Sequence, residues 1–98
     1  MTVFWTRNAI VSLSKIIDYL REHWTEKEVI KFLADIRKSI RLIQKNPYIY
    51  MASETKDEIR KGFVNKKVRL FYKINTKRNR IDLLLFWDNR QNPKTHGY

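Results

Sequence analysis

The chain of 98 residues lacks cysteine and contains only two glycines, two prolines and two histidines. Without cysteine it has neither a disulfide framework nor a thiolate metal site. Gly62 and Gly97 are too far apart to form a glycine-rich phosphate-binding loop. His23 and His96 are likewise too widely separated for a metal-binding motif. We therefore expect no metal and no cofactor.

Long hydrophobic runs are absent as well. No stretch approaches the roughly twenty apolar residues that a membrane span requires. The N-terminus lacks the basic start and apolar core of a signal peptide. We therefore expect a cytoplasmic protein that makes no membrane contact. The apolar fraction of 43% is typical of a folded protein, and this length predicts a single domain, residues 1–98, with one modest core.

Acidic residues are scarce: 10 against 21 lysines and arginines, for a net charge of +11. Ten of the basic residues lie between positions 56 and 80 beside only two acids, a local net charge of +8. Residues 5–47 carry nine basic and five acidic residues, a net charge of only +4. The basic surface should attract nucleic acid or an acidic protein segment, although a solvated surface without a partner is the plain alternative.

The first half of the chain has helical periodicity and predicts two helices. Their N-cap residues are expected at Thr6 and Thr25, whose hydroxyls can accept from free N–H groups of the first turn. The second helix should end at Asn46, because the residue before proline is disfavoured in a helix. A short link around Trp24 predicts an antiparallel hairpin. The apolar stripes comprise Ala9, Leu13, Ile16, Ile17 and Leu20, then Val29, Phe32, Leu33, Ile36, Ile40 and Ile43.

The second half alternates with period two and predicts strands at 58–64, 68–74 and 80–87. In the middle strand Leu70 and Tyr72 should face the helices, while Arg69 points away. The last strand is apolar on both faces, which favours a central position, and residues 1–4 should add an outer strand. The predicted fold is α+β, an N-terminal strand and an antiparallel helical hairpin packed on a small antiparallel sheet. Four residues are expected to be largely buried in its core: Leu33, Ile36, Leu70 and Leu83.

This order of elements and motifs resembles the RelE/ParE superfamily of bacterial toxins. The resemblance implies the toxin half of a type II toxin–antitoxin pair, of the kind associated with plasmid stabilisation and growth arrest. Its partner would be an antitoxin with an acidic segment that folds on binding. The superfamily includes ribosome-dependent RNA-cleaving toxins and DNA gyrase inhibitors. The matching residues are Trp5-Thr6 before Ala9, Tyr19, Asn46-Pro47, Ile59-Arg60, Val68-Arg69-Leu70-Phe71-Tyr72, and positions 85–93 from Leu85 to Pro93.

RNA cleavage would require a base, an acid and positive charge near the reacting phosphate. Arg60 and Arg69, on neighbouring predicted strands, are the catalytic candidates for that chemistry, since arginine donates two parallel hydrogen bonds to phosphate. The RNA-cleaving branch typically has a His or Tyr just after the last strand. That place is held here by Trp87-Asp88-Asn89-Arg90. His96 and Tyr98 lie at the C-terminal end, where fraying is the default.

Other proton-transfer candidates are few. Tyr72 is expected in the core, and His23 is expected to be an ordinary turn residue. Three acids lie near the basic segment, where either general-base chemistry or pairing with Lys and Arg would account for them: Glu54, Asp57 and Glu58.

The sequence therefore favours a ParE-like toxin that arrests growth by binding DNA gyrase or another DNA-associated target. A RelE-like endoribonuclease that cleaves messenger RNA on the ribosome, with an altered catalytic set, is the second hypothesis. A nucleic-acid-binding module without toxicity is the third. The same target-binding or anion-binding residues serve all three hypotheses: Arg60, Lys61, Arg69, Lys73 and Arg90.

Overall fold

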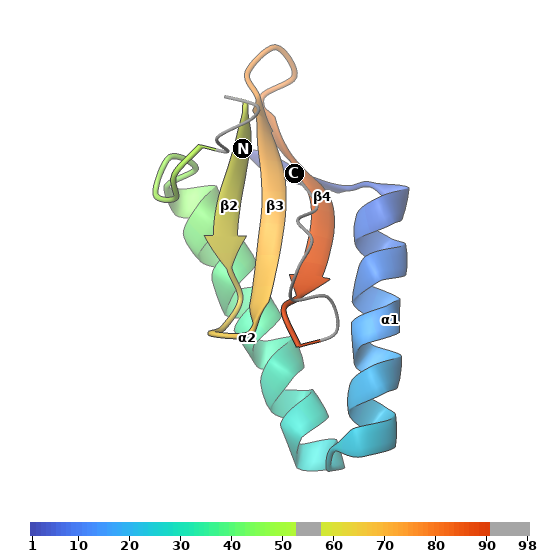
Figure 1. The fold of residues 1–98 in the computed structure, drawn as a ribbon. Coiled ribbons are helices and arrows are strands. Elements are labelled where there is room, and N and C mark those ends of the chain that lie inside the picture. Colours follow the sequence, from blue (N-terminus) through green and yellow to red (C-terminus); the bar gives the residue numbers. More distant parts are fainter. Residues whose placement is uncertain (53–57, 91–98) are drawn as a thin grey trace.

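The computed structural model describes residues 1–52 and 58–90 (Figure 1). Its elements follow in the order β1 (Thr2–Trp5), α1 (Arg7–His23), α2 (Glu26–Lys45), β2 (Ile59–Phe63), β3 (Val68–Asn75) and β4 (Arg80–Asp88). This confirms the predicted α+β class and element order. Within the described ranges, neither helix combines the length and apolar character needed to cross a membrane.

Both helices begin at the predicted caps. The hydroxyl of Thr6 accepts a hydrogen bond from the Ala9 N–H at 3.2 Å, and that of Thr25 accepts from the Glu28 N–H at 3.3 Å. Each bond satisfies one of the free donors that every helix N-terminus exposes. Asn46 caps the end of α2 in a non-helical conformation, as expected for the residue before Pro47.

The four strands form one sheet in the order β1-β4-β3-β2. β4 is central, as predicted, and pairs antiparallel with β3, which in turn pairs antiparallel with β2. β1 lies parallel to β4 and pairs with its first four residues, from Arg80 opposite Thr2 to Leu83 opposite Trp5. The first residues of the chain therefore complete a sheet whose other strands come from its second half.

The helices cover one face of the sheet, with α2 behind β2 and β3 and α1 alongside β4 (Figure 1). This inner face presents Leu70 and Leu83, both fully buried, to the helical stripes. Ile36 is also buried, whereas Leu33 is only half-buried at the margin of the core. Burial is thus confirmed for three of the four predicted core residues. The opposite, outer face carries Lys61, Phe63, Arg69, Phe71, Lys73 and Trp87.

A β-bulge interrupts the alternation of β4. Phe71 pairs with Leu85 but Tyr72 pairs with Leu83, which leaves Leu84 without a partner on β3. The bulge lets both Leu83 and Phe86 reach the inner face. Two side chains at the start of α1 bind the backbone there: Thr6 Oγ1 donates to the Leu83 carbonyl at 2.7 Å, and Ser12 Oγ accepts from the Phe86 N–H at 3.0 Å.

Candidate functional site

Three of the predicted basic residues meet on the outer face. Lys61 of β2 lies opposite Phe71 of β3, and Arg69 lies between Phe63 on one side and Trp87 on the other. Lys73 of β3 points to the same face two residues beyond Phe71, opposite Ile59 of β2. All three basic side chains are partly exposed. Phe71 itself is fully buried, so the surface shows these three basic residues beside the exposed Phe63 and the partly exposed Trp87, a composition suited to an anionic partner.

Arg69 is the least satisfied of these basic groups. Its guanidinium carbon lies 5.6 Å from the centroid of the Phe63 ring. Its Nε, and the indole nitrogen of its neighbour Trp87, are buried without a hydrogen-bond acceptor among residues 1–52 and 58–90. A buried donor without an acceptor costs about 1–3 kcal/mol. Two such donors side by side favour an acceptor-bearing ligand at this point of the outer face.

Arg60 does not join this group. It pairs in register with Tyr72, so its side chain lies on the inner side of the sheet. Its Nη1 donates to the Tyr50 carbonyl at 2.8 Å, and its guanidinium carbon lies 4.8 Å from the Tyr48 ring centroid. These contacts tie the segment after α2 to β2. The structure therefore places the two catalytic candidates, Arg60 and Arg69, on opposite faces of the sheet.

Tyr72 is a core residue, as predicted. The side chain is fully buried, and its hydroxyl donates to the Pro47 carbonyl at 2.6 Å. Burial raises the pKa of Tyr72 from 10.0 to about 12, partly opposed by the positive charge of Arg60. The phenol is therefore neutral at physiological pH. It donates a hydrogen bond to a backbone carbonyl on the inner side of the sheet, so it is not available for proton transfer on the outer face.

The raised pKa of Tyr72 predicts a loss of stability in alkali. Because the folded-state value of about 12 exceeds the ordinary value of 10.0, this contribution is complete below about pH 10 and disappears as the pH rises through about 12. Tyr72→Phe should remove that alkaline step and cost about 1 kcal/mol at neutral pH through the lost hydrogen bond. Unfolding followed by circular dichroism, with phenolate absorbance recorded in parallel, measures both effects.

Tyr48→Phe is the control for this prediction, because Tyr48 is 58% exposed. It should keep the alkaline step of the unchanged chain. If both variants lost stability at the same alkaline midpoint, Tyr72 would not be the group responsible.

The two acids on the described strands are already paired. Asp82 Oδ1 accepts from Arg80 Nε at 2.6 Å, and Asp88 receives two hydrogen bonds from the Arg90 guanidinium at 3.0 Å each. Glu58 is exposed just before β2. The other proposed proton-transfer residues lie outside the described residues: Glu54, Asp57, His96 and Tyr98. Over residues 1–52 and 58–90, no three histidine or acidic side chains gather to form a metal site.

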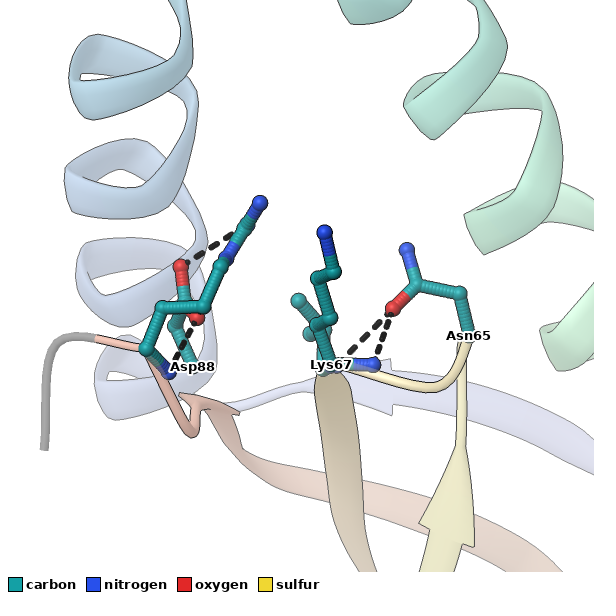
Figure 2. Close-up of polar contacts among 5 residues, drawn as sticks. Asn65, Lys67 and Asp88 are labelled. Carbon is teal, nitrogen blue, oxygen red and sulfur yellow. Dashed lines mark hydrogen bonds and ion pairs between the residues drawn. The ribbon is translucent and has the colours of Figure 1, made fainter. Parts of the chain in front are cut away.

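Arg90, the fifth predicted residue, lies at a different place, in the turn after β4. Its guanidinium carbon is 5.7 Å from the Trp24 ring centroid, and Lys67 Nζ is 5.5 Å from the same centroid. Figure 2 shows Asn65, Lys67 and Asp88 at this end of the sheet, with the Lys67 side chain extending between the two helices. A pocket of about 440 Å³ opens here, lined by residues of α1, α2 and both strand ends, among them Leu20, Trp24, Glu28, Phe32, Asp35, Asn65, Lys67 and Arg90.

We call this cavity the hairpin-end pocket. Sequence reasoning did not predict Trp24, Lys67 or Asn65 as members of a site. One signal was available: a tryptophan in a short polar link has no core to enter, and Trp24 is indeed 40% exposed. Asn65 shapes the pocket rim, because its Oδ1 accepts from the backbone N–H groups of Lys67 and Val68 at 2.8 and 2.9 Å.

A family model described as the ParE toxin of the type II toxin–antitoxin system parDE matches residues 3–93. Among solved structures, the chain resembles one titled the chromosomal ParDE TA system from P. aeruginosa, with a TM-score of 0.73 and 19% identity over 90% of this chain and 95% of that one. It also resembles a YoeB/ParE toxin from Agrobacterium tumefaciens, with a TM-score of 0.63 and 12% identity over 90% and 98% of the two chains. No curated protein gives a significant match.

Proposed function

Because this chain belongs to the ParE toxin family of type II toxin–antitoxin systems, we propose that it arrests bacterial growth by binding DNA gyrase. The outer face of the sheet is the proposed contact surface, with Lys61, Arg69 and Lys73 as its basic residues. Inhibition by binding requires a complementary surface, whereas RNA cleavage also requires groups that take up and release protons.

One observation carries the preference for binding over cleavage: the ionisable groups on the described strands that could transfer protons are engaged in other contacts. Asp82 is held by Arg80 and Asp88 by Arg90. Tyr72 donates to a backbone carbonyl on the inner side of the sheet. The basic residues of the outer face therefore have no free proton-transfer partner among these strand residues, and their charge favours recognition of an anionic surface.

The partner that restrains the toxin is an antitoxin, as the parDE family description implies. We propose that it carries an acidic segment that folds on binding, with apolar side chains along the helices or sheet edge and carboxylates near Arg69 and Arg90. The net charge of +11 supports this choice, because opposite charge accelerates the association of two proteins.

The proposed mechanism predicts two results from one preparation of the purified chain. It should block the supercoiling of relaxed plasmid by gyrase, and the Arg69→Gln variant should block it much less. Messenger RNA on translating ribosomes should stay intact under the same conditions. Lys77→Gln, which removes one charge from the exposed turn between β3 and β4, is the charge-matched control and should inhibit gyrase like the unchanged chain.

Cleavage of messenger RNA in phase with the codons, with supercoiling unaffected, would instead assign the chain to the RNA-cleaving branch. A folded chain that produced neither effect and did not arrest growth would favour the plain nucleic-acid-binding module.

A further inference from the structure

The hairpin-end pocket has a firm apolar floor and one exposed aromatic ring. Leu20 and Phe32, on α1 and α2, are only 5% and 4% exposed, whereas Trp24 between them in sequence is 40% exposed. The pocket volume of about 440 Å³ is large enough for one or two side chains of a partner, within the usual range for binding pockets. The floor therefore offers an apolar contact surface in a part of the molecule that is otherwise highly charged.

Two cations flank the exposed ring. The orientation of the Arg90 guanidinium is set by Asp88. The Asp88 side chain is only 1% exposed and accepts one hydrogen bond from Arg90 Nε and another from Arg90 Nη2. This leaves Nη1 without a bond to Asp88. Lys67 approaches the ring of Trp24 at 5.5 Å and has no ion pair with any residue in 1–52 or 58–90. The sheet side of the pocket therefore presents one oriented guanidinium and the ammonium groups of Lys67 and the neighbouring Lys66, neither of which has an ion pair among the described residues.

The helix side of the pocket carries the opposite charge. Glu28 and Asp35 line it from α2, with Lys31 between them. A nucleic-acid strand carries a phosphate at every nucleotide, so its chain would meet these carboxylates as well as the cations. A peptide can instead turn a single carboxylate toward Lys67 and Arg90 and set a neighbouring apolar side chain on Trp24. The mixed charge of the walls favours a peptide over a nucleic acid.

We propose that the hairpin-end pocket is a docking site for the antitoxin, and that it takes an acidic residue followed or preceded by an apolar one. The carboxylate pairs with Lys67 and with the outward edge of Arg90, and the apolar side chain packs on Trp24 above Leu20 and Phe32. The choice of partner rests on the function proposed above. The pocket shares no lining residue with the basic outer-face group of Lys61, Arg69 and Lys73, so the antitoxin can fill the pocket with one part of its acidic segment and place other carboxylates near Arg69.

The test uses the cognate antitoxin as its probe, titrated into the full chain in a calorimeter. Lys67→Gln should weaken binding by about tenfold or more, the effect of losing one charge-assisted hydrogen bond. Trp24→Leu should weaken it comparably by removing the aromatic surface. Lys67 is exposed and its side chain contributes no hydrogen bond within the described residues, so Lys67→Gln tests the proposal even if Trp24→Leu fails to fold.

Lys77→Gln is the matched control, since it removes the same charge from the turn at the opposite end of the sheet (Figure 1). It should change the affinity by no more than about twofold, in keeping with an exposed charge far from the contact. If the Lys67→Gln and Trp24→Leu variants bound the antitoxin as tightly as Lys77→Gln does, the pocket would not be the docking site, although the antitoxin would still be the partner. No binding by the unchanged chain would overturn the proposed partner. A single-stranded RNA probe that binds the unchanged chain and loses affinity through Lys67→Gln, with antitoxin binding unaltered, would assign the pocket to nucleic acid instead.

Discussion

Replacing Leu70 by alanine is expected to lower the free energy of unfolding by about 2–5 kcal/mol, the usual range for emptying a buried leucine site. Leu70 is fully buried on the inner face of β3, where it packs in the core cluster formed by the sheet and both helices. The substitution removes the side chain and leaves a cavity that a sheet held on both sides by neighbouring strands cannot readily close. Chemical denaturation with urea measures the change.

Leu42→Ala on α2 is the control for this experiment, because Leu42 is 40% exposed. The same chemical change there should cost less than about 1 kcal/mol, since surface substitutions have small effects. Equal losses for the two variants would mean that the core does not lie between the inner face and the helices as the structure shows.

Arg69→Gln and Arg60→Gln each remove one positive charge but are expected to affect different properties: toxicity for Arg69→Gln and stability for Arg60→Gln. Arg69→Gln should relieve growth arrest while the protein stays folded, because Arg69 lies on the outer face and has no hydrogen-bonded or ion-paired partner among the described residues. Arg60→Gln should instead lower the free energy of unfolding by about 1.5–3 kcal/mol, the value of a hydrogen bond from a charged group, since it breaks the bond to the Tyr50 carbonyl.

Two measurements distinguish these outcomes: colony counts after induction and thermal unfolding of the purified variants. Full toxicity of a folded Arg69→Gln variant would exclude the outer face as the target surface. Unchanged stability of Arg60→Gln would show that the segment after α2 does not depend on this contact.

Local patterns were sufficient to predict most of the fold. Thr6, Thr25 and Asn46-Pro47 act through bonds and steric limits within a few residues, so their roles can be predicted from neighbouring sequence. The alternation of β3 was equally informative, because Leu70 and Tyr72 pack inward while Arg69 points outward. The bulge at Leu84 was not predicted. The backbone groups beside it, the Leu83 carbonyl and the Phe86 N–H, are hydrogen-bonded to Thr6 and Ser12, more than seventy residues away in the sequence.

The site was less predictable than the fold, and β2 shows why. Ile59 and Phe63 suggest an inward face by their apolar character, yet both lie on the outer side in register with Lys73 and Arg69. The inner side at Gly62 is occupied instead by the Tyr50 ring, so close that a Cβ on Gly62 would lie 3.2 Å from the ring. Arg60 shares this inward side with Gly62, and the residue types of β2 alone do not indicate it. The hairpin-end pocket likewise depends on residues that only the fold brings together.

The parallel pairing of β1 with β4 also bears on when the molecule assembles during its synthesis. The residues of β1, Thr2–Trp5, stay unpaired until residues 80–83 have left the ribosome, because each of them pairs with one of those four residues. Such distant contacts are the slow ones in folding, since a long loop of chain must close before they form. The sheet that carries the outer face is therefore complete only once β4 has been made. Until residues 80–83 have been made, a nascent chain can form neither the β1–β4 pairing nor the complete sheet.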